Sequence, residues 1–499
     1  MSLLVLPILI PLASAVAAFC CGRRYSWQNA VSIGGSILQL GACAMLLEAV
    51  FRSGIQAEQM GGWPAPFGIT LVADHLSAIM LLITAIIALS ANIYALADID
   101  RTYKALGFHA LYQILIAGIC GAFLTGDLFN LYVWFEVMLM ASFGLLVMGG
   151  TPRQLDGGVK YVTLNLMATL MFITGLGLLY AMTGTLNMAD LHMKMQHLTN
   201  PALATAVAML FIMAFGLKAG AFPLFFWLPS SYHTPPPAIA AVFSGLLTKV
   251  GVYALLRVFT LIFTRDVVAT HSLLLVMACL TMVTGVLGAA VQTEFRRILG
   301  FHIISQVGYM IMGLGLYTSL ALAGSIFYLI HHIIVKANLF LISGLVSKRY
   351  GHDDLNRLGG LYRSAGGIAV LFLVPAFSLA GFPPLSGFWA KFVLLQASME
   401  VGAYLVAAIA LVVGFLTIYS MTKIWIAVFW KPLPVEGEPA SMRAKGHLSA
   451  LMLVPVIVLA AMTVAIGLGP QPFLEMALRA AEELLTPEHY VRAVLGGVP

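Results

Sequence analysis

Long apolar segments dominate this sequence of 499 residues, in which 61% of the residues are hydrophobic and only 9% are charged. A helix needs about 20 apolar residues to cross a bilayer core, whereas a soluble protein of this length needs far more polar side chains to cover its surface. We count fourteen such segments. The sequence therefore excludes a soluble globular fold and predicts an all-α, polytopic membrane protein with about 14 transmembrane helices.

The fourteen predicted helices have approximate bounds. They cover residues 2–22, 28–51, 73–97, 106–124, 127–149, 158–183, 202–231, 236–263, 271–293, 297–318, 320–347, 366–399, 401–430 and 448–468. The seventh and the twelfth are too long for one straight span, and each has a proline near its middle. Proline removes a backbone hydrogen bond and clashes with the preceding turn, so we expect these two helices to be discontinuous.

The two predicted breaks also share a sequence pattern. Residues 218–229 and 380–391 both contain Ala-Gly, then Phe-Pro, then Phe-Trp. The pair predicts two five-helix repeats, residues 105–265 and 266–431, each interrupted in its fourth helix. Three N-terminal helices (1–104) would precede them, and a loop, a last helix and a tail (432–499) would follow. Transporters built from repeats use such paired interrupted helices for ion sites.

Basic residues in the connections predict the orientation, because Lys and Arg remain on the cytoplasmic side. Odd-numbered connections contain fifteen Lys or Arg, including Arg443 and Lys445, and even-numbered connections contain three. We therefore expect the odd connections to be cytoplasmic and both termini to face outside.

Ionisable side chains also lie inside the predicted helices. Lys218, Lys249, Lys336 and Lys391 lie far from the helix ends, and Glu136 is about as deep. A lysine at mid-bilayer costs at least about 2.5 kcal/mol, and intramembrane ionisable residues usually mark ion or proton paths. The five residues predict a polar file that runs parallel to the membrane plane.

Histidines add a second class of proton carrier. His332 and Lys336 are four residues apart and share one helix face, whereas His331 points about 140° away from Lys336. His302 is the next candidate. A lone histidine in a bundle is usually a packing residue, but beside an intramembrane lysine an imidazole can relay protons near neutral pH.

Four other charged residues have simpler interpretations. Arg257 and Lys423 lie nearer to helix ends, and the sequence leaves open whether they snorkel to the interface. Asp74 and Asp127 lie near helix starts, where an acidic side chain favours the helix N-terminus. Asp127 is nine positions before Glu136, so it faces the opposite side and is interpreted as a cap.

Cofactor motifs are absent from the sequence. The five cysteines lie in apolar runs without a Cys-x-x-Cys pair, and no His/Cys cluster has metal-ligand spacing. Neither Gly-x-Gly-x-x-Gly after a strand nor a Walker-type Gly-x-x-x-x-Gly-Lys-Ser/Thr occurs. We therefore expect no cofactor, no bound metal and no nucleic-acid partner.

Four segments carry a resemblance to a known family. They are Gly126-Asp-Leu-Phe-Asn-Leu-Tyr-Val-Trp-Phe-Glu136, Lys218 with Phe222-Pro-Leu-Phe-Phe-Trp-Leu-Pro229, Ser244-Gly-Leu-Leu-Thr-Lys-Val-Gly-Val-Tyr253 and Gly381-Phe-Pro-Pro-Leu-Ser-Gly-Phe-Trp-Ala-Lys391. The sequence resembles the antiporter-like subunits shared by respiratory complex I and the multisubunit Mrp-type Na+/H+ antiporters. Phe225 stands where many complex I homologues have a histidine, which favours the Mrp branch, and His75 follows Asp74 where a glycine is frequent.

The resemblance implies roles and partners. It implies that Glu136 and Lys218 form the input pair, that Lys249 is the central carrier, that His332 with Lys336 is the link, and that Lys391 is the exit group. The chain would be a transporter subunit, not an enzyme, and would move protons, and possibly Na+, beside other membrane subunits in the lipid bilayer of a bacterial cell (inner) membrane. Two alternatives stay open: a proton-pumping subunit of a complex I-type oxidoreductase or membrane-bound hydrogenase, and a self-sufficient solute transporter.

Overall fold

The computed structural model describes residues 2–198, 200–432 and 449–496, and these are almost entirely helical. Each of the fourteen predicted segments contains a helix, so the all-α prediction is confirmed. Eleven helices of the described chain are long and apolar enough to cross a membrane, and α1, α5 and α17 are shorter apolar helices. The count of fourteen crossings stays a prediction.

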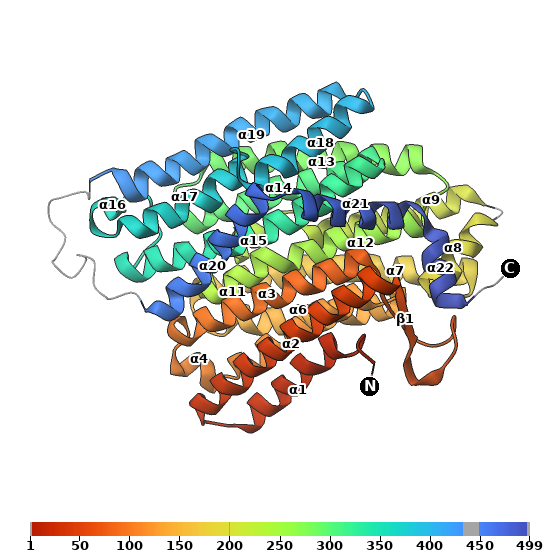
Figure 1. The fold of residues 1–499 in the computed structure, drawn as a ribbon, viewed down its shortest axis with the longest axis horizontal. Helices are drawn as coiled ribbons and strands as arrows, with labels where there is room; N and C mark the ends of the chain where they lie inside the picture. Colours follow the sequence, from red (N-terminus) through yellow and green to blue (C-terminus); the bar gives the residue numbers. More distant parts are fainter. Residues whose placement is uncertain (1, 199, 433–448, 497–499) are drawn as a thin grey trace.

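The main helices are α1 Leu6–Cys20, α2 Tyr25–Ser53, α3 His75–Asp98, α5 Phe108–Leu124, α6 Leu128–Val147, α7 Pro152–Thr183, α9 Pro201–Ala219, α11 Pro237–Val242 with α12 Thr248–Leu261, α13 Val267–Val291, α14 Phe295–Leu316, α15 Ser319–Tyr350, α17 Gly366–Ala380, α18 Ser386–Glu400, α19 Tyr404–Trp425 and α20 Ala450–Leu468. The shorter helices are α4 Arg101–Ala105, α8 Met188–Gln196, α10 Trp227–Ser231, α16 Leu361–Ser364, α21 Gln471–Leu485 and α22 Pro487–Leu495. Figure 1 shows the long helices side by side, with α1 and α2 along one edge and α19 along the opposite edge.

Both predicted breaks are present. The α9 helix ends at Ala219 and α10 begins at Trp227, while α17 ends at Ala380 and α18 begins at Ser386. Gly220 and Gly381, which follow the two helix ends, adopt positive φ angles of 76° and 96°. This left-handed conformation favours glycine, which explains the Ala-Gly pair ahead of each proline segment.

The centre of the bundle is formed by α12 and α15. Every residue from Ala321 to Val346 is buried, as is every residue from Ala238 to Phe263. The α15 helix packs against α14, α18, α17, α20, α21 and α3. Lys249 on α12 and His332 and Lys336 on α15 are ionisable, and such side chains in membrane helices almost always face the bundle interior, which accounts for this central position.

The structure also contains elements that the sequence did not predict. Strands β1 Gln56–Gln59 and β2 Thr70–Ala73 form an antiparallel hairpin between α2 and α3. The C-terminal segment after α20 is helical: α21 packs against α15 and α3, and α22 packs against α8 and β1. Arg443 and Lys445, which were assigned to a cytoplasmic connection, lie outside the described residues.

Candidate functional site

Glu136 and Lys218 are joined through a third residue. The Thr169 hydroxyl, on α7, donates to Glu136 Oε1 at 2.6 Å and accepts from Lys218 Nζ at 3.2 Å. No ion pair of 4.0 Å or less joins the lysine to the glutamate in the described chain. Lys218 Nζ also lies 4.9 Å from the centre of the Phe135 ring. The carboxylate and the ammonium are therefore close neighbours that share one hydroxyl.

Lys218 borders a small enclosed space. A cavity of about 20 Å³ is lined by Lys218, Asn165, Tyr232 and Leu247, among others. A water molecule needs about 10–15 Å³ of such space and several polar partners. The Tyr232 hydroxyl is buried and has no hydrogen-bond partner among the described residues. The cavity thus has the size and polar lining for one water on the side of Lys218 that faces α12.

Lys249 lies in α12, directly after a π-helical turn at Phe243–Leu247. Its side chain is fully buried, and Nζ donates to the Ser244 carbonyl, a backbone group that the wide turn leaves accessible. The α12 helix approaches the α9 break closely because of Gly251: a Cβ there would lie 2.6 Å from the backbone nitrogen of Ala219. This contact brings the helices that carry Lys218 and Lys249 together.

His332 and Lys336 continue the file on α15. Lys336 Nζ donates to the Leu299 carbonyl of α14 at 3.0 Å. His332 is fully buried, and neither ring nitrogen has a partner in the described chain. The π-helical turn before Lys249 packs against this stretch of α15: a Cβ on Gly245 would lie 3.5 Å from the Ile333 carbonyl oxygen. His332 therefore lies one turn before Lys336, on a helix that contacts the turn ahead of Lys249, with both ring nitrogens free to form hydrogen bonds.

The other two histidines have defined partners. His331 Nδ1 is 2.8 Å from Ser386 Oγ, at the start of α18, so His331 contacts the second helix break. His302 Nε2 is 2.6 Å from Ser420 Oγ of α19. The second ring nitrogen of each is buried without a partner among the described residues. Both histidines belong to the polar region beyond Lys336.

Lys391 lies at the far end, on α18. Its Nζ donates at 2.9 Å to the carbonyl of Ala380, the last residue of α17, and lies 5.2 Å from the centre of the Tyr309 ring. The broken helix thus supplies the acceptor, because its last carbonyls have no partner within the helix. A cavity of about 240 Å³, lined by Lys391, Tyr309 and Gly414, opens beside the ammonium.

The four lysines share one property. Each is at least 92% buried, yet none forms an ion pair with a carboxylate within 4.0 Å in the described parts of the chain. Their acceptors are a hydroxyl or backbone carbonyls. Further buried polar atoms without a partner line the same helices: Thr248 Oγ1, Ser305 Oγ, Gln306 Nε2 and both amide atoms of Asn338. Buried polar groups normally have partners, and water is the usual one when protein does not supply it.

The sequence missed the residues that connect the ionisable groups. Thr169 contacts both Glu136 and Lys218. Ser244 contacts Lys249, and Ser386 contacts His331. Hydroxyl side chains and backbone carbonyls are common in membrane helices, so no sequence motif distinguished these three residues from others of their kind. A threonine on the predicted helix between Glu136 and Lys218 was the one available clue.

The four remaining charged residues also have defined contacts. Arg257 does not snorkel: its guanidinium pairs with Asp74 at 2.6 Å, and both side chains are at least 95% buried. Lys423 donates to the carbonyls of Ala290 and Gln292 at 3.0 and 2.7 Å. Asp127 accepts from the backbone N–H of Asn130, which confirms its interpretation as a cap of α6.

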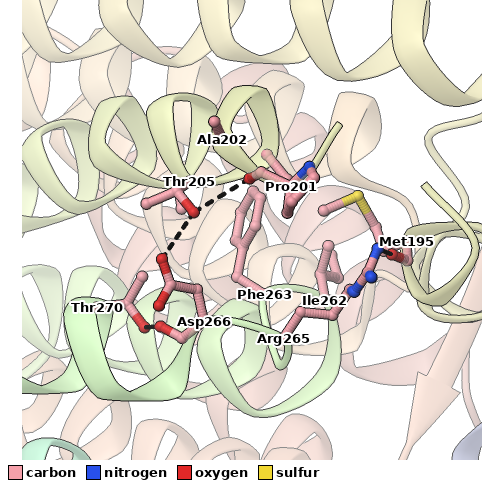
Figure 2. Close-up of a pocket in the computed structure, with 11 residues that line it drawn as sticks. Met195, Pro201, Ala202, Thr205, Ile262, Phe263, Arg265, Asp266 and Thr270 are labelled. Atoms are coloured by element: carbon pink, nitrogen blue, oxygen red, sulfur yellow. Dashed lines mark hydrogen bonds between the residues drawn. The ribbon is translucent and has the colours of Figure 1, made fainter. Parts of the chain in front are cut away.

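Other cavities of the described chain lie away from the file. One of about 400 Å³ lies where α9 and α13 begin and α12 ends, and in Figure 2 the Thr205 hydroxyl donates to Asp266 at 2.9 Å in its wall. A polar cavity of about 730 Å³ opens among the odd-numbered connections, and its lining includes His233. Burial, together with Arg297 and Arg296, lowers the pKa of His233 to about 4. Neither cavity contains a predicted site residue.

Known proteins share both the sequence and this architecture. Residues 125–417 match the family described as NADH:quinone oxidoreductase/Mrp antiporter, TM. A relative from Alkalihalophilus pseudofirmus, named as one subunit of a Na(+)/H(+) antiporter, is 45% identical over 99% of each chain. A protein of the same name from Bacillus subtilis is 39% identical over 98% of this chain and 99% of its own.

Three solved structures have the same fold. A chain of the Mrp complex from Dietzia sp. DQ12-45-1b is 33% identical with a TM-score of 0.92, over 99% of both chains. A chain of the membrane-bound sulfane sulfur reductase, an archaeal respiratory membrane complex, is 26% identical with a TM-score of 0.91, over 99% of both. A chain of respiratory complex I from Thermus thermophilus has a TM-score of 0.82 at 22% identity, over 99% of this chain and 100% of its own, and shows the fold alone.

Proposed function

Since the chain belongs to the NADH:quinone oxidoreductase/Mrp antiporter family of membrane subunits, we propose that it is an ion-translocating subunit of a multisubunit Na+/H+ antiporter. It is a multi-pass membrane protein and a transporter subunit, not an enzyme. The observation that carries the proposal is the row of four buried lysines without a fixed carboxylate partner among the described residues. An ammonium that is not locked in an ion pair can lose its proton to a neighbour.

In the proposed mechanism, protons move laterally from one buried group to the next. Glu136 near Lys218 favours the protonated lysine, and withdrawal of the carboxylate drives the proton towards Lys249. At an effective dielectric constant of about 20, moving one unit charge from about 4 to about 8 Å changes the interaction by roughly 2 kcal/mol. That energy shifts a protonation equilibrium about 30-fold, which suffices for one transfer step.

The later steps use the groups beyond Lys249. His332 would receive the proton between Lys249 and Lys336, because both of its ring nitrogens are without a protein partner in the described chain. His302 and His331 border the region between Lys336 and Lys391. Lys391 would release the proton, since it borders a cavity next to the second helix break.

The proposal includes the orientation and the internal symmetry. Both termini would face outside in a bacterial cell membrane, and residues 105–265 and 266–431 would be two repeats, each with its break in the fourth helix. The matching breaks after Ala219 and Ala380 support this division.

The alternative is a proton-pumping subunit of a redox complex, which the fold similarity to respiratory complexes permits. Sequence identity favours the antiporter: 45% and 39% with two antiporter subunits, compared with 26% and 22% with the chains of the two redox complexes. Identifying the subunits that co-purify with the chain distinguishes the antiporter from the redox complex. Small membrane proteins without cofactors support the antiporter, and iron–sulfur proteins would support the redox complex.

Exchange measured in vesicles that contain the intact complex tests the proposal. Glu136→Ala, Lys218→Ala and Lys391→Ala should each abolish Na+-driven proton flux after a pH jump while the complex still assembles. Lys160→Ala is the matched control, because Lys160 is half-exposed and pairs with Asp156 on the surface of α7. Normal exchange from an assembled Lys218→Ala complex would refute the proposed role.

A further inference from the structure

A second group of buried polar side chains lies in the N-terminal helices, away from the lysine file. Ser32, Ser36 and Gln39 on α2, Asn92 on α3 and Gln113 on α5 all have 0% exposure. The α2, α3 and α5 helices pack against one another, and Figure 1 shows α2 and α3 next to each other at one edge of the bundle. We name these five residues the amide seam. Four of them hydrogen-bond to one another across the three helices.

The hydrogen bonds in the amide seam orient two side-chain amides. Ser36 Oγ donates to the Ser32 carbonyl at 3.0 Å, so its proton is used and its lone pairs must accept. Asn92 Nδ2 donates to the hydroxyls of Ser32 and Ser36 at 2.9 and 3.0 Å. Gln113 Nε2 donates to the Ser32 carbonyl at 3.0 Å, and it also lies 3.1 and 3.3 Å from the same two hydroxyls. Both NH2 groups therefore face the serines.

This arrangement leaves the amide oxygens without partners. Asn92 Oδ1, Gln113 Oε1 and Gln39 Oε1 are buried and accept no hydrogen bond in the described parts of the chain. A buried carbonyl oxygen without a partner costs about 1–3 kcal/mol. Polar residues often join membrane helices, but a purely structural contact would satisfy these oxygens. An excess of acceptors favours a ligand that carries positive charge or donates protons.

The chemistry of the acceptors indicates the class of ligand. All three unpartnered atoms are neutral amide oxygens, which are hard ligands suited to hard cations. None of the five seam residues carries a carboxylate, so the site lacks the negative charge that a divalent cation requires. In membrane proteins, neutral oxygens can replace the hydration shell of a monovalent cation.

The amide seam continues towards one end of α2. Gln28 and Asn29 precede Ser32 on that helix, and His109 of α5 contacts Asn29 at 2.9 Å through Nε2. Gln28 Oε1 also lacks a partner among the described residues. The spacing of three or four residues places Asn29, Ser32, Ser36 and Gln39 on one face of α2. In the proposed orientation this end is cytoplasmic, so the polar stripe leads from the cytoplasmic surface inward.

We propose that the amide seam is a sodium-binding site, loaded from the cytoplasmic face, in which the side-chain oxygens of Asn92, Gln113 and Gln39 coordinate the ion. The inference rests on the proposed function, because it identifies where that exchange binds Na+. The site lies outside residues 125–417, which match the family model, and uses none of the lysines of the proton file. Sodium and protons would thus occupy separate parts of the chain.

The Na+ dependence of exchange tests this site. Vesicles with the intact complex are titrated with NaCl, and the concentration for half-maximal proton flux is determined. Asn92→Leu and Gln113→Leu should each raise that concentration by at least about tenfold, the loss expected for a polar contact to a charge, while the maximal rate is retained. Ser36→Ala, which removes one hydroxyl and is milder, should raise it in the same direction. Thr84→Val is the matched control: Thr84 is also on α3 and fully buried, but its hydroxyl bonds to its own helix.

A binding measurement provides a second readout. NaCl should raise the melting temperature of the purified intact complex above that in choline chloride at equal ionic strength, because a ligand that binds the folded state stabilises it. Asn92→Leu should abolish this difference, and Thr84→Val should keep it. The inference would be overturned if Ser36→Ala and Gln113→Leu both reach half-maximal proton flux at an NaCl concentration within about twofold of that of the unmodified complex. An equal shift in Thr84→Val would also overturn it. If the unmodified complex shows no Na+-dependent proton flux, the proposed function itself fails.

Discussion

Replacing Thr169 with valine should remove the hydroxyl that joins Glu136 to Lys218 and slow exchange. Glu136 Oε1 and Lys218 Nζ lie 2.6 and 3.2 Å from the Thr169 hydroxyl, so they are no more than about 5.8 Å apart, the sum of the two distances. At an effective dielectric constant of about 20, unit charges at that distance attract by roughly 3 kcal/mol. Valine keeps the shape of threonine but leaves both charged groups without this partner, at a cost of about 1.5–3 kcal/mol.

A loss of about 2 kcal/mol in the transfer step corresponds to a roughly 30-fold lower rate of exchange. The assay is Na+-driven collapse of a pH gradient in vesicles with the intact complex, with assembly checked on a native gel. Thr169→Ser is the matched control, because serine keeps the hydroxyl and should retain most of the activity. An assembled Thr169→Val complex that exchanges ions within about twofold of the unmodified rate would refute the reasoning.

Three further changes give different readouts. Lys249→Gln keeps a donor for the π-helical turn but cannot carry a proton, so exchange should fall about 100-fold without loss of assembly; retained exchange would contradict the central role of Lys249. Gly387→Ala would push a Cβ into the Ser378 carbonyl oxygen and to 2.8 Å from the His331 ring, so it should destabilise the complex by at least about 1–3 kcal/mol and lower its melting temperature, whereas Gly367→Ala, which meets open space, should not. Equal melting temperatures would contradict the tight contact at the second break. His233 has a folded-state pKa of about 4, below its ordinary value, so the unfolded chain binds more protons and the complex should lose stability as the pH falls from about 6.5 to 4. His233→Gln should reduce this acid-induced fall in melting temperature, and an unchanged pH profile would contradict the shift.

The sequence could predict the helices, the breaks and the ionisable residues, because each is a strong exception within apolar surroundings. A lysine or a proline inside a run of about 20 apolar residues has few explanations besides function or a kink. These features need no knowledge of which helices are neighbours. The breaks after Ala219 and Ala380 are therefore in the expected segments.

The sequence could not predict contacts that depend on helix packing. Thr169 bridges two residues on other helices, and the Arg257–Asp74 ion pair joins α12 to the start of α3. Asn92 and Gln113 are polar residues without a motif, and only the packing of α2, α3 and α5 brings them together. The β1–β2 hairpin lies in a connection whose short polar strand carries little pattern.

Ordered water in the intact complex, imaged by electron cryo-microscopy, tests the central claim most directly. The account predicts water density within hydrogen-bonding distance of both His332 ring nitrogens, of the Asn338 amide, and in the cavity between Lys218 and Tyr232. Such density would join the buried amines into one connected path. A map in which these amines are dry, and each is held by a fixed carboxylate from a neighbouring chain, would contradict it.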